Sequence, residues 1–183
     1  MQKQTDLSKY DNSWYKPGKN AFVRLLWYFT NIALFKSGFP INSIKISMLR
    51  MFGARIGKGV VLKPHVSVKY PWRLSIGNYV WIGENAWIDN LDDVSIDDNV
   101  CISQGALLLC GNHHYKKTTF DLITAPIHIK QGAWIGAKSI VCPGIIVGSH
   151  AVLAVGSVAT NHLNEYTVYQ GNPAQPIKKR EIE

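Results

Sequence analysis

Residues 129–158 read IKQGAW IGAKSI VCPGII VGSHAV LAVGSV, five hexads that follow one another without a slip. An aliphatic residue opens each hexad, and Ala, Ser or Ile takes its fifth place. A helix rotates by about 100° per residue, so successive hexads would place these aliphatic side chains about 240° apart around its axis. A strand has a period of two and returns all of them to one face. The stretch therefore predicts strands.

Three such hexads close a triangular coil, because each unit supplies one short strand and one corner, and stacked coils bury a continuous aliphatic core. The same spacing begins at Ile56 and recurs between interruptions at residues 69–73 and 89–93. Eleven clear hexads in all predict a stack of slightly less than four coils. An antiparallel sandwich is the alternative, but hairpin turns such as Asn-Gly are missing from the chain. The sequence thus favours an all-β fold, a parallel β-helix of hexapeptide repeats.

The ends of the repeat set the expected organisation of the 183 residues. We expect the β-helix domain at residues 55–160, with one long loop at 108–128. An N-terminal arm and helical segment takes residues 1–54, and a short C-terminal tail takes residues 161–183. A short stack needs its ends covered, and these two flanking segments are the candidates for that role.

The composition suits a globular domain with an anionic partner. Hydrophobic residues make up 46% of the chain, and 20 Lys and Arg against 12 Asp and Glu leave a net charge of +8. This excess favours a phosphate-bearing ligand and leaves nucleic acid and membrane surfaces open. Cys101, Cys110 and Cys142 have no CxxC spacing, so neither a disulfide framework nor a zinc site is indicated. A reducing cytoplasm is the simple inference.

The N-terminal segment reads as a polar arm followed by two helices. Residues 1–20 are polar and carry Tyr10, Trp14 and Tyr15, which suits an arm that lies across another part of the molecule. Residues 21–35 are apolar for about four turns, which is short of the roughly 20 residues that cross a bilayer. This helix either packs on the repeat domain or a neighbouring subunit, or lies on a membrane surface. Residues 43–52 predict a second helix that ends at Gly53.

The loop at 108–128 is the strongest candidate for chemistry. Long loops in compact domains are usually functional or disordered, and Phe120 with its apolar neighbours favours an ordered one. Two adjacent histidines, His113 and His114, lie in this loop. A histidine can take a proton from a hydroxyl or an amine near neutral pH. The chain has no Gly-x-Ser-x-Gly elbow that would suggest a covalent serine mechanism. His113 is therefore a candidate general base.

Three tryptophans and a basic tail complete the candidate features. Trp81, Trp87 and Trp134 take the sixth place of a hexad, so alternation turns them outward. We expect a subunit interface or the arm to cover Trp81 and Trp87, and the loop or a ligand to contact Trp134. Residues 178–180 are Lys-Lys-Arg, which either form a solvated helix end or meet phosphates.

These features together resemble the hexapeptide-repeat acyltransferases, and within them the colanic acid biosynthesis acetyltransferases. That resemblance implies a left-handed parallel β-helix, a hand that the spacing alone does not give. The likeness spans essentially the whole chain. It rests on DLSKYDNSWYKPG at 6–18, GKGVV at 57–61, ISQGA at 102–106, GNH at 111–113, TFDL at 119–122, WIGA at 134–137 and GNPA at 171–174.

The resemblance also implies the parts of the active site. The family uses acetyl-CoA as a substrate, a sugar acceptor and no metal, and it forms homotrimers with sites between subunits. Its catalytic histidine falls on His113, although the Asp that usually follows is His114 here, which leaves open what orients the imidazole. Acceptor-binding candidates are Asn90, His114 and Tyr115. The coenzyme A positions are Trp134, Ala137, Val155, Gly156, Thr160 and Asn161, the last in place of the usual Lys, with Lys178 and Lys179 for a phosphate.

The leading hypothesis is a cytoplasmic, acetyl-CoA-dependent O-acetyltransferase that acts on a saccharide hydroxyl in surface polysaccharide biosynthesis. His113 would act as the general base in direct transfer, and nucleic acid is not among the expected partners. N-acetylation of an amino sugar or of a small acceptor is the near alternative. A non-catalytic β-helix scaffold, docked on a membrane through residues 21–35, is the alternative from another class. A zinc hydratase is disfavoured, because no His-x₄-His spacing accompanies the histidine pair.

Overall fold

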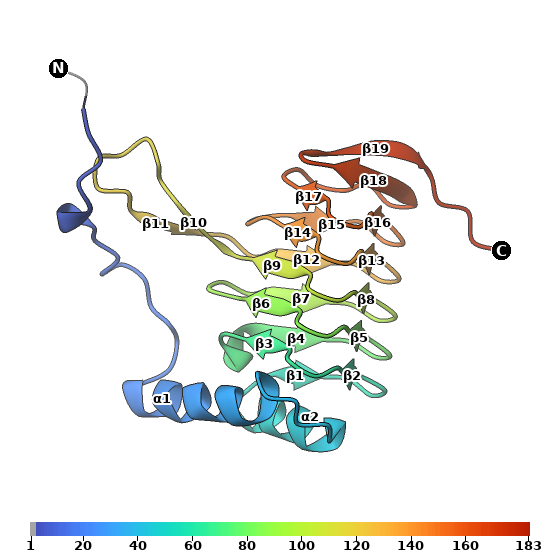
Figure 1. The fold of residues 1–183 in the computed structure, drawn as a ribbon, viewed down its shortest axis with the longest axis horizontal. Helices are drawn as coiled ribbons and strands as arrows, with labels where there is room; N and C mark the ends of the chain where they lie inside the picture. Colours follow the sequence, from blue (N-terminus) through green and yellow to red (C-terminus); the bar gives the residue numbers. More distant parts are fainter. Residues whose placement is uncertain (1–2) are drawn as a thin grey trace.

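The computed structural model describes residues 3–183 and winds most of them into a triangular prism (Figure 1). Each side of the prism is a parallel sheet whose neighbouring strands come from successive coils. Sheet A contains β1 (Arg55–Ile56), β4 (Leu74–Ile76), β7 (Val94–Ile96), β12 (Ile127–Ile129) and β15 (Ile146–Val147). Sheet B contains β2 (Val61–Leu62), β5 (Trp81–Ile82), β8 (Cys101–Ile102), β13 (Trp134–Ile135) and β16 (Val152–Leu153), continued by β18 (Thr167–Gly171). Sheet C contains β3 (Ser67–Val68), β6 (Trp87–Asp89), β9 (Leu107–Leu109), β14 (Ile140–Val141) and β17 (Val158–Ala159).

The predicted all-β fold, a left-handed parallel β-helix with an N-terminal helical segment, is confirmed. The predicted number of coils is too small. Sheets A, B and C each take one strand from five complete coils, and β18 begins a sixth. The difference arises because residues 69–73 and 89–93 extend outward at corners, so the chain resumes pairing in register after each interruption.

The core of the prism consists of the residues that open the hexads. Ile129, Ile135, Val141, Val147 and Leu153 are all completely buried. The fifth-place residues are buried as well, and the hydroxyl of Ser139 donates a hydrogen bond to the carbonyl of Ala154 at 2.7 Å. Burial of one such aliphatic side chain stabilises the fold by about 1.5–3 kcal/mol, so the repeated row forms the main stabilising contact of the domain.

Glycine after an inward aliphatic residue allows the coils to stack closely. A Cβ atom at Gly136 would lie 2.6 Å from the carbonyl oxygen of Leu153 in the next coil. At Gly83 it would lie 2.6 Å from the backbone nitrogen of Gln104. Because real Cβ contacts do not come this close, a larger residue at either corner would push neighbouring coils apart.

Two helices cover the first end of the prism (Figure 1). They are α1 (Ala21–Thr30), continued by the π-helical turn η2 (Asn31–Phe35), and α2 (Asn42–Met51). Trp27 packs against Phe35 and Phe52, and its indole N–H donates to the carbonyl of Val68 at 3.1 Å. The predicted helices at 21–35 and 43–52 are therefore present, and one face of the first lies on the prism.

Lys45 of α2 is completely buried, and its ammonium group lies 3.3 Å from the carbonyl oxygens of Leu62 and Lys63. Burial lowers the pKa of this amine. In the part of the chain that the structure describes, no helix has the length and apolar character needed to cross a membrane.

The C-terminal tail closes the other end. Strand β18 pairs with β16, and β19 (Ala174–Lys179) returns antiparallel to β18. Lys178 and Lys179 therefore lie on a strand at the edge of sheet B. The alternative of a solvated helix end at residues 178–180 is wrong, because the turn at 171–174 reverses the chain into a hairpin.

The close stacking of coils predicts a destabilising effect of Gly136→Ala. The added methyl group meets the backbone of the next coil, so the free energy of unfolding should fall by about 1–3 kcal/mol. Urea denaturation at one fixed protein concentration measures the change. Gln131→Ala, at an exposed corner of the same coil, is the control and should change stability by less than about 0.5 kcal/mol. Equal stability of the two variants would contradict the proposed constraint.

Candidate active site

The loop at 108–128 leaves the prism after sheet C and returns to sheet A as an ordered hairpin. Its strands are β10 (Gly111–His113) and β11 (Leu122–Thr124), which pair antiparallel with His113 opposite Leu122. Cys110 at the base is completely buried, and burial raises the pKa of its thiol to about 12. A thiol that stays protonated at neutral pH is a poor nucleophile.

The imidazole of His113 is held by Phe120 from across the hairpin. The Nδ1 atom lies 3.0 Å from the carbonyl oxygen of Phe120, and the two rings stack with centroids 4.4 Å apart at an angle of 9°. Since a carbonyl oxygen only accepts hydrogen bonds, Nδ1 carries the proton and Nε2 keeps its lone pair. This arrangement leaves Nε2 as the basic nitrogen of the ring.

Phe120 adopts an uncommon backbone conformation to make this contact. Its φ is 52°, in the left-handed region that bulky residues rarely adopt. Such strain persists where the surrounding structure imposes it, and it is concentrated at functional sites. The imidazole is therefore oriented by the backbone carbonyl and the ring of Phe120.

The N-terminal arm lies along this hairpin. The backbone N–H of Asp6 donates to the carbonyl of Thr118 at 2.8 Å, and the ring of Tyr10 lies 5.9 Å from that of His113. Further along the arm, the hydroxyl of Tyr15 donates to the carbonyl of Leu91 at 2.7 Å. The arm expected at residues 1–20 thus contacts both the tip of the loop and the corner beneath it.

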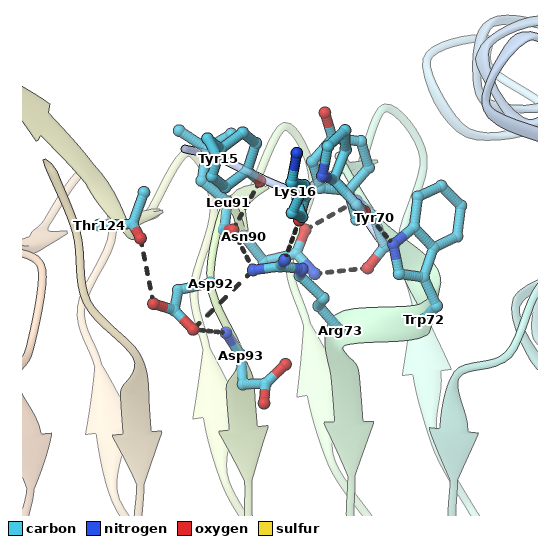
Figure 2. Close-up of polar contacts among 11 residues, drawn as sticks. Tyr15, Lys16, Tyr70, Trp72, Arg73, Asn90, Leu91, Asp92, Asp93 and Thr124 are labelled. Carbon is cyan, nitrogen blue, oxygen red and sulfur yellow. Dashed lines mark hydrogen bonds and ion pairs between the residues drawn. The ribbon is translucent and has the colours of Figure 1, made fainter. Parts of the chain in front are cut away.

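Arg73 links the arm to the base of the loop (Figure 2). Its guanidinium group donates to the carbonyl oxygens of Lys16 and Leu91 and lies 4.0 Å from the carboxylate of Asp92. The same carboxylate accepts a hydrogen bond from the hydroxyl of Thr124 on β11 at 3.2 Å. The two interruptions of the hexad pattern therefore supply the residues that hold the arm and the loop together.

The three acceptor-binding candidates lie in different environments. Asn90 is completely buried, and its side-chain amide bonds both backbone polar groups of Tyr70, at 2.9 and 2.6 Å. This geometry favours a structural role for Asn90. His114 is half-buried beside His113, and its backbone N–H donates to the carbonyl of Asp121. Tyr115 is exposed at the tip of the loop.

A hollow of about 560 Å³ lies between α1 and the outer face of sheet C. Asp89 is almost completely buried in its wall, with one carboxylate oxygen 2.9 Å from the ammonium group of Lys69. Asn31 is also in the wall, and its buried side-chain oxygen has no hydrogen-bond partner among residues 3–183. Aromatic rings of Tyr70 and Trp87 complete the lining. Sequence reasoning missed Asp89, although a carboxylate directly after the buried Ile88 was a usable signal.

A second hollow, of about 640 Å³, lies on sheet B and brings together three predicted coenzyme A residues. Trp134, Lys178 and Lys179 all line it, together with Arg180. The indole N–H of Trp134 donates to the hydroxyl of Ser103 at 2.8 Å, which fixes the ring on the face of the sheet. The site therefore combines one aromatic surface with three cations and one carboxylate, that of Glu181.

The remaining coenzyme A candidates lie outside this hollow. Ala137, Val155 and Gly156 lie at the corner between sheets B and C, where the N–H of Gly156 donates to the carbonyl of Ala137 at 2.9 Å. Thr160 and Asn161 follow β17 and are exposed. Ala137, Val155 and Gly156 thus form an edge along two successive coils, whereas Thr160 and Asn161 lie at the next corner, after sheet C.

One chain does not bring the histidine and the tryptophan hollow together. The hairpin β10–β11 extends from one side of the prism, whereas β8, β13 and β16 of sheet B lie on the other (Figure 1). The outward positions of Trp81, Trp87 and Trp134 are confirmed, and all three rings remain exposed in the single chain. No cluster of three or more His, Cys, Asp or Glu side chains suited to a metal ion is present among residues 3–183.

Comparisons with known proteins place the chain among acetyltransferases. No protein-family model matches it. It is 33% identical over 164 residues to the "Putative colanic acid biosynthesis acetyltransferase WcaF" of Escherichia coli K12, a match that covers 89% of this chain and 90% of that protein. The galactoside O-acetyltransferase of the same organism is 27% identical over 136 residues, which cover 73% of this chain and 67% of that protein.

Solved structures agree with this placement. A galactoside acetyltransferase in complex with coenzyme A has a TM-score of 0.77 and 25% identity, with 87% of this chain and 82% of that chain covered. A hexapeptide-repeat acetyltransferase from Vibrio cholerae has a TM-score of 0.79 at 19% identity, with 88% and 92% covered, and shows the likeness of fold.

The prism of hexapeptide repeats and these relatives define the class, and the predicted acyltransferase is confirmed. The chain belongs to the family of the colanic acid biosynthesis acetyltransferases.

The contacts of Arg73 predict that the arm and the loop loosen together when it is replaced. Arg73→Gln removes charged hydrogen bonds to two segments, so backbone amides in residues 6–18 and 111–124 should exchange with deuterium about ten to a hundred times faster. Arg55→Gln is the matched control, since Arg55 is exposed and bonds only the hydroxyl of Ser75 among the described side chains. Faster exchange in one segment without the other would contradict the coupling.

Proposed function

We propose that the protein transfers the acetyl group of acetyl-CoA to a saccharide hydroxyl during the synthesis of a surface polysaccharide, in the cytoplasm. The observation that carries the proposal is the basic Nε2 atom of His113, held on a braced hairpin by the carbonyl of Phe120. The names of the relatives, which include a colanic acid biosynthesis acetyltransferase and a galactoside O-acetyltransferase, support this substrate class.

In the proposed reaction, Nε2 of His113 takes the proton of the acceptor hydroxyl while the hydroxyl oxygen attacks the thioester carbonyl carbon. The resulting tetrahedral intermediate collapses when its carbon–sulfur bond breaks. The imidazolium then returns the proton to the departing coenzyme A thiolate. A backbone N–H is expected to stabilise the oxyanion. The raised pKa of the Cys110 thiol supports direct transfer rather than an acyl-enzyme on this residue.

We assign the nucleotide end of acetyl-CoA to the tryptophan hollow on sheet B. Lys178, Lys179 and Arg180 supply three cations for phosphate groups, and the exposed face of Trp134 is a surface for an apolar segment. The edge formed by Ala137, Val155 and Gly156 continues from there and suits the pantetheine arm. Thr160 and Asn161 would flank its end. The relative solved with coenzyme A supports such a site in this fold.

The complete site requires a second copy of the chain. Because the hairpin with His113 and the hollow with Trp134 lie on different sides of one prism, they can meet only between neighbouring subunits. We therefore propose a homotrimer in which one subunit provides the histidine and the next provides the hollow. Exposed Trp81 and Trp87 would be covered by such contacts.

The hollow between α1 and the outer face of sheet C is the proposed acceptor site. Asp89, Asn31 and Lys69 offer acceptors and donors for hydroxyl groups, and the rings of Tyr70 and Trp87 offer flat faces for a sugar. The ion pair with Lys69 neutralises Asp89, which favours a neutral hydroxyl over the ammonium group of an amino sugar. His114 and Tyr115 would contact the acceptor from the loop.

Loss of the proposed base should abolish most activity. His113→Ala should lower kcat for coenzyme A release with sugar acceptors by at least about a hundredfold, since general-base catalysis contributes 10² to 10⁴. Release of free thiol measures the rate. His65→Ala is the matched control, because His65 is exposed and also places Nδ1 beside a carbonyl oxygen, that of Lys36. Near-normal turnover of His113→Ala would remove the assigned role.

Mixed trimers test the shared site. His113→Ala and the triple variant Trp134→Ala, Lys178→Ala, Lys179→Ala should each be inactive alone. Refolded together in equal amounts, they should regain activity at about one quarter of the sites, because that share pairs an intact histidine with an intact hollow. Absence of any recovery, with mixed trimers shown by mass spectrometry, would place both halves of the site on one chain.

A further inference from the structure

The solvent face of α1 is apolar throughout. Phe22, Leu25 and Phe29 are 74%, 56% and 59% exposed, and Leu26 and Ile32 lie beside them at helical spacing. The opposite face of this helix already packs on the prism through Trp27. A surface helix of a globular protein normally turns polar residues to water. A helix that is apolar on both faces is therefore expected to bind something on its outer face.

The apolar surface continues from α1 onto the segment around α2. Ile41, Ile44 and Met51 are exposed at the same end of the prism. Leu26 of α1 and Met51 of α2 line one hollow, and we call the exposed apolar residues of the two helices together the helical end. Contiguous apolar surface of this kind on a folded protein marks a contact with a protein or a membrane.

The N-terminal third of the chain, which includes both helices of this end, also carries the excess positive charge of the protein. Residues 1–63 contain 11 Lys and Arg and only two acidic residues, whereas residues 64–183 contain nine basic and ten acidic residues. The net charge of +8 is thus confined to the arm, the two helices and the first coil. Lys16, Lys19 and Arg50 are exposed, and Lys19 lines a hollow together with Leu26 of α1 and Met51 of α2.

We propose that the helical end docks on the surface of an anionic lipid bilayer. A helix of ten residues is too short to span the bilayer, but its apolar face can enter the boundary between headgroups and acyl chains while flanking cations meet lipid phosphates. A head-to-head contact with a second copy is disfavoured, because it would bring two strongly positive ends together. The inference extends beyond the proposed reaction and does not depend on it.

Docking in this way would give the molecule a fixed orientation. The acceptor hollow has Arg24, Leu25 and Tyr28 of α1 in its wall, so it would open close to the lipid surface. The tryptophan hollow lies toward the other end of the prism, beside β18 and β19, and would remain in the aqueous phase (Figure 1). A water-soluble donor and an acceptor carried on a lipid would then approach from different sides.

Sedimentation of the full-length protein with vesicles tests the proposal. The protein should pellet with vesicles of equal parts phosphatidylglycerol and phosphatidylethanolamine and stay in solution with phosphatidylcholine vesicles. Leu25→Gln with Phe29→Gln should lower the partition coefficient at least about tenfold, because two apolar side chains leave the interface. Lys16→Gln with Lys19→Gln should lower it by a similar factor in low salt and have little effect in high salt.

The matched control is Ile177→Gln with Ile182→Gln, the same chemical change at two exposed positions near the opposite end. This variant should bind vesicles like the unmodified protein, and circular dichroism should show that all variants fold. Equal partition to both kinds of vesicle, or unchanged binding by the Leu25 and Phe29 variant, would overturn the proposal. A third outcome would also overturn it: the unmodified protein binds no vesicles, and the Leu25 and Phe29 variant has a lower oligomeric mass. That result would assign the apolar face to a contact with a second copy of the chain.

Discussion

The parallel contact between successive coils is the constraint on which the other features depend. Each coil turns an aliphatic residue such as Ile135 inward and then places its backbone directly against the next coil, where Gly136 leaves no room for a side chain. The coils cannot slip in register, because a shift of one residue would turn the buried row toward water. The result is a rigid frame on which loops have defined positions.

Side-chain contacts outside the coils fix the position of the histidine loop on this frame. Arg73, Asp92 and Thr124 join the arm, a corner and the return strand of the hairpin, and Figure 2 shows Asp92 between the other two, linked to both by polar contacts. Within the hairpin, the strained backbone of Phe120 supplies the oxygen that faces Nδ1 of His113. A strained contact of this type keeps its geometry only because the surrounding segments are fixed.

The features that repeat could be predicted from the sequence, and those that depend on distant segments could not. The inward residues and the outward tryptophans follow from the period of the hexads, so they were found correctly. The number of coils was underestimated, because a corner that extends outward looks like a break when only the sequence is read. The tail around Lys178 forms a strand because β18 pairs with β16 and then offers its own free edge to β19, which no local pattern reveals.

In the candidate site, too, only features set by local sequence could be predicted, and those set by distant segments could not. His113 was proposed from its motif and stays a prediction, whereas its contact with Phe120 depends on a hairpin register that the sequence does not contain. Asn90 was chosen as an acceptor residue, but the chain turns it inward and leaves Asp89, one position earlier, in the wall of a hollow. A difference of one position at a corner decides which side chain lines the hollow, and corner geometry is set by contacts with neighbouring coils.

The central claim is that acetyl transfer takes place between subunits, with the histidine of one chain beside the thioester bound by the next. A crystal structure of the protein with acetyl-CoA tests it most directly. We expect the nucleotide at Trp134 and Lys178, and the thioester carbon close enough to a neighbour's His113 Nε2 for one hydroxyl group to bridge them. A thioester remote from every copy of His113 would contradict the account.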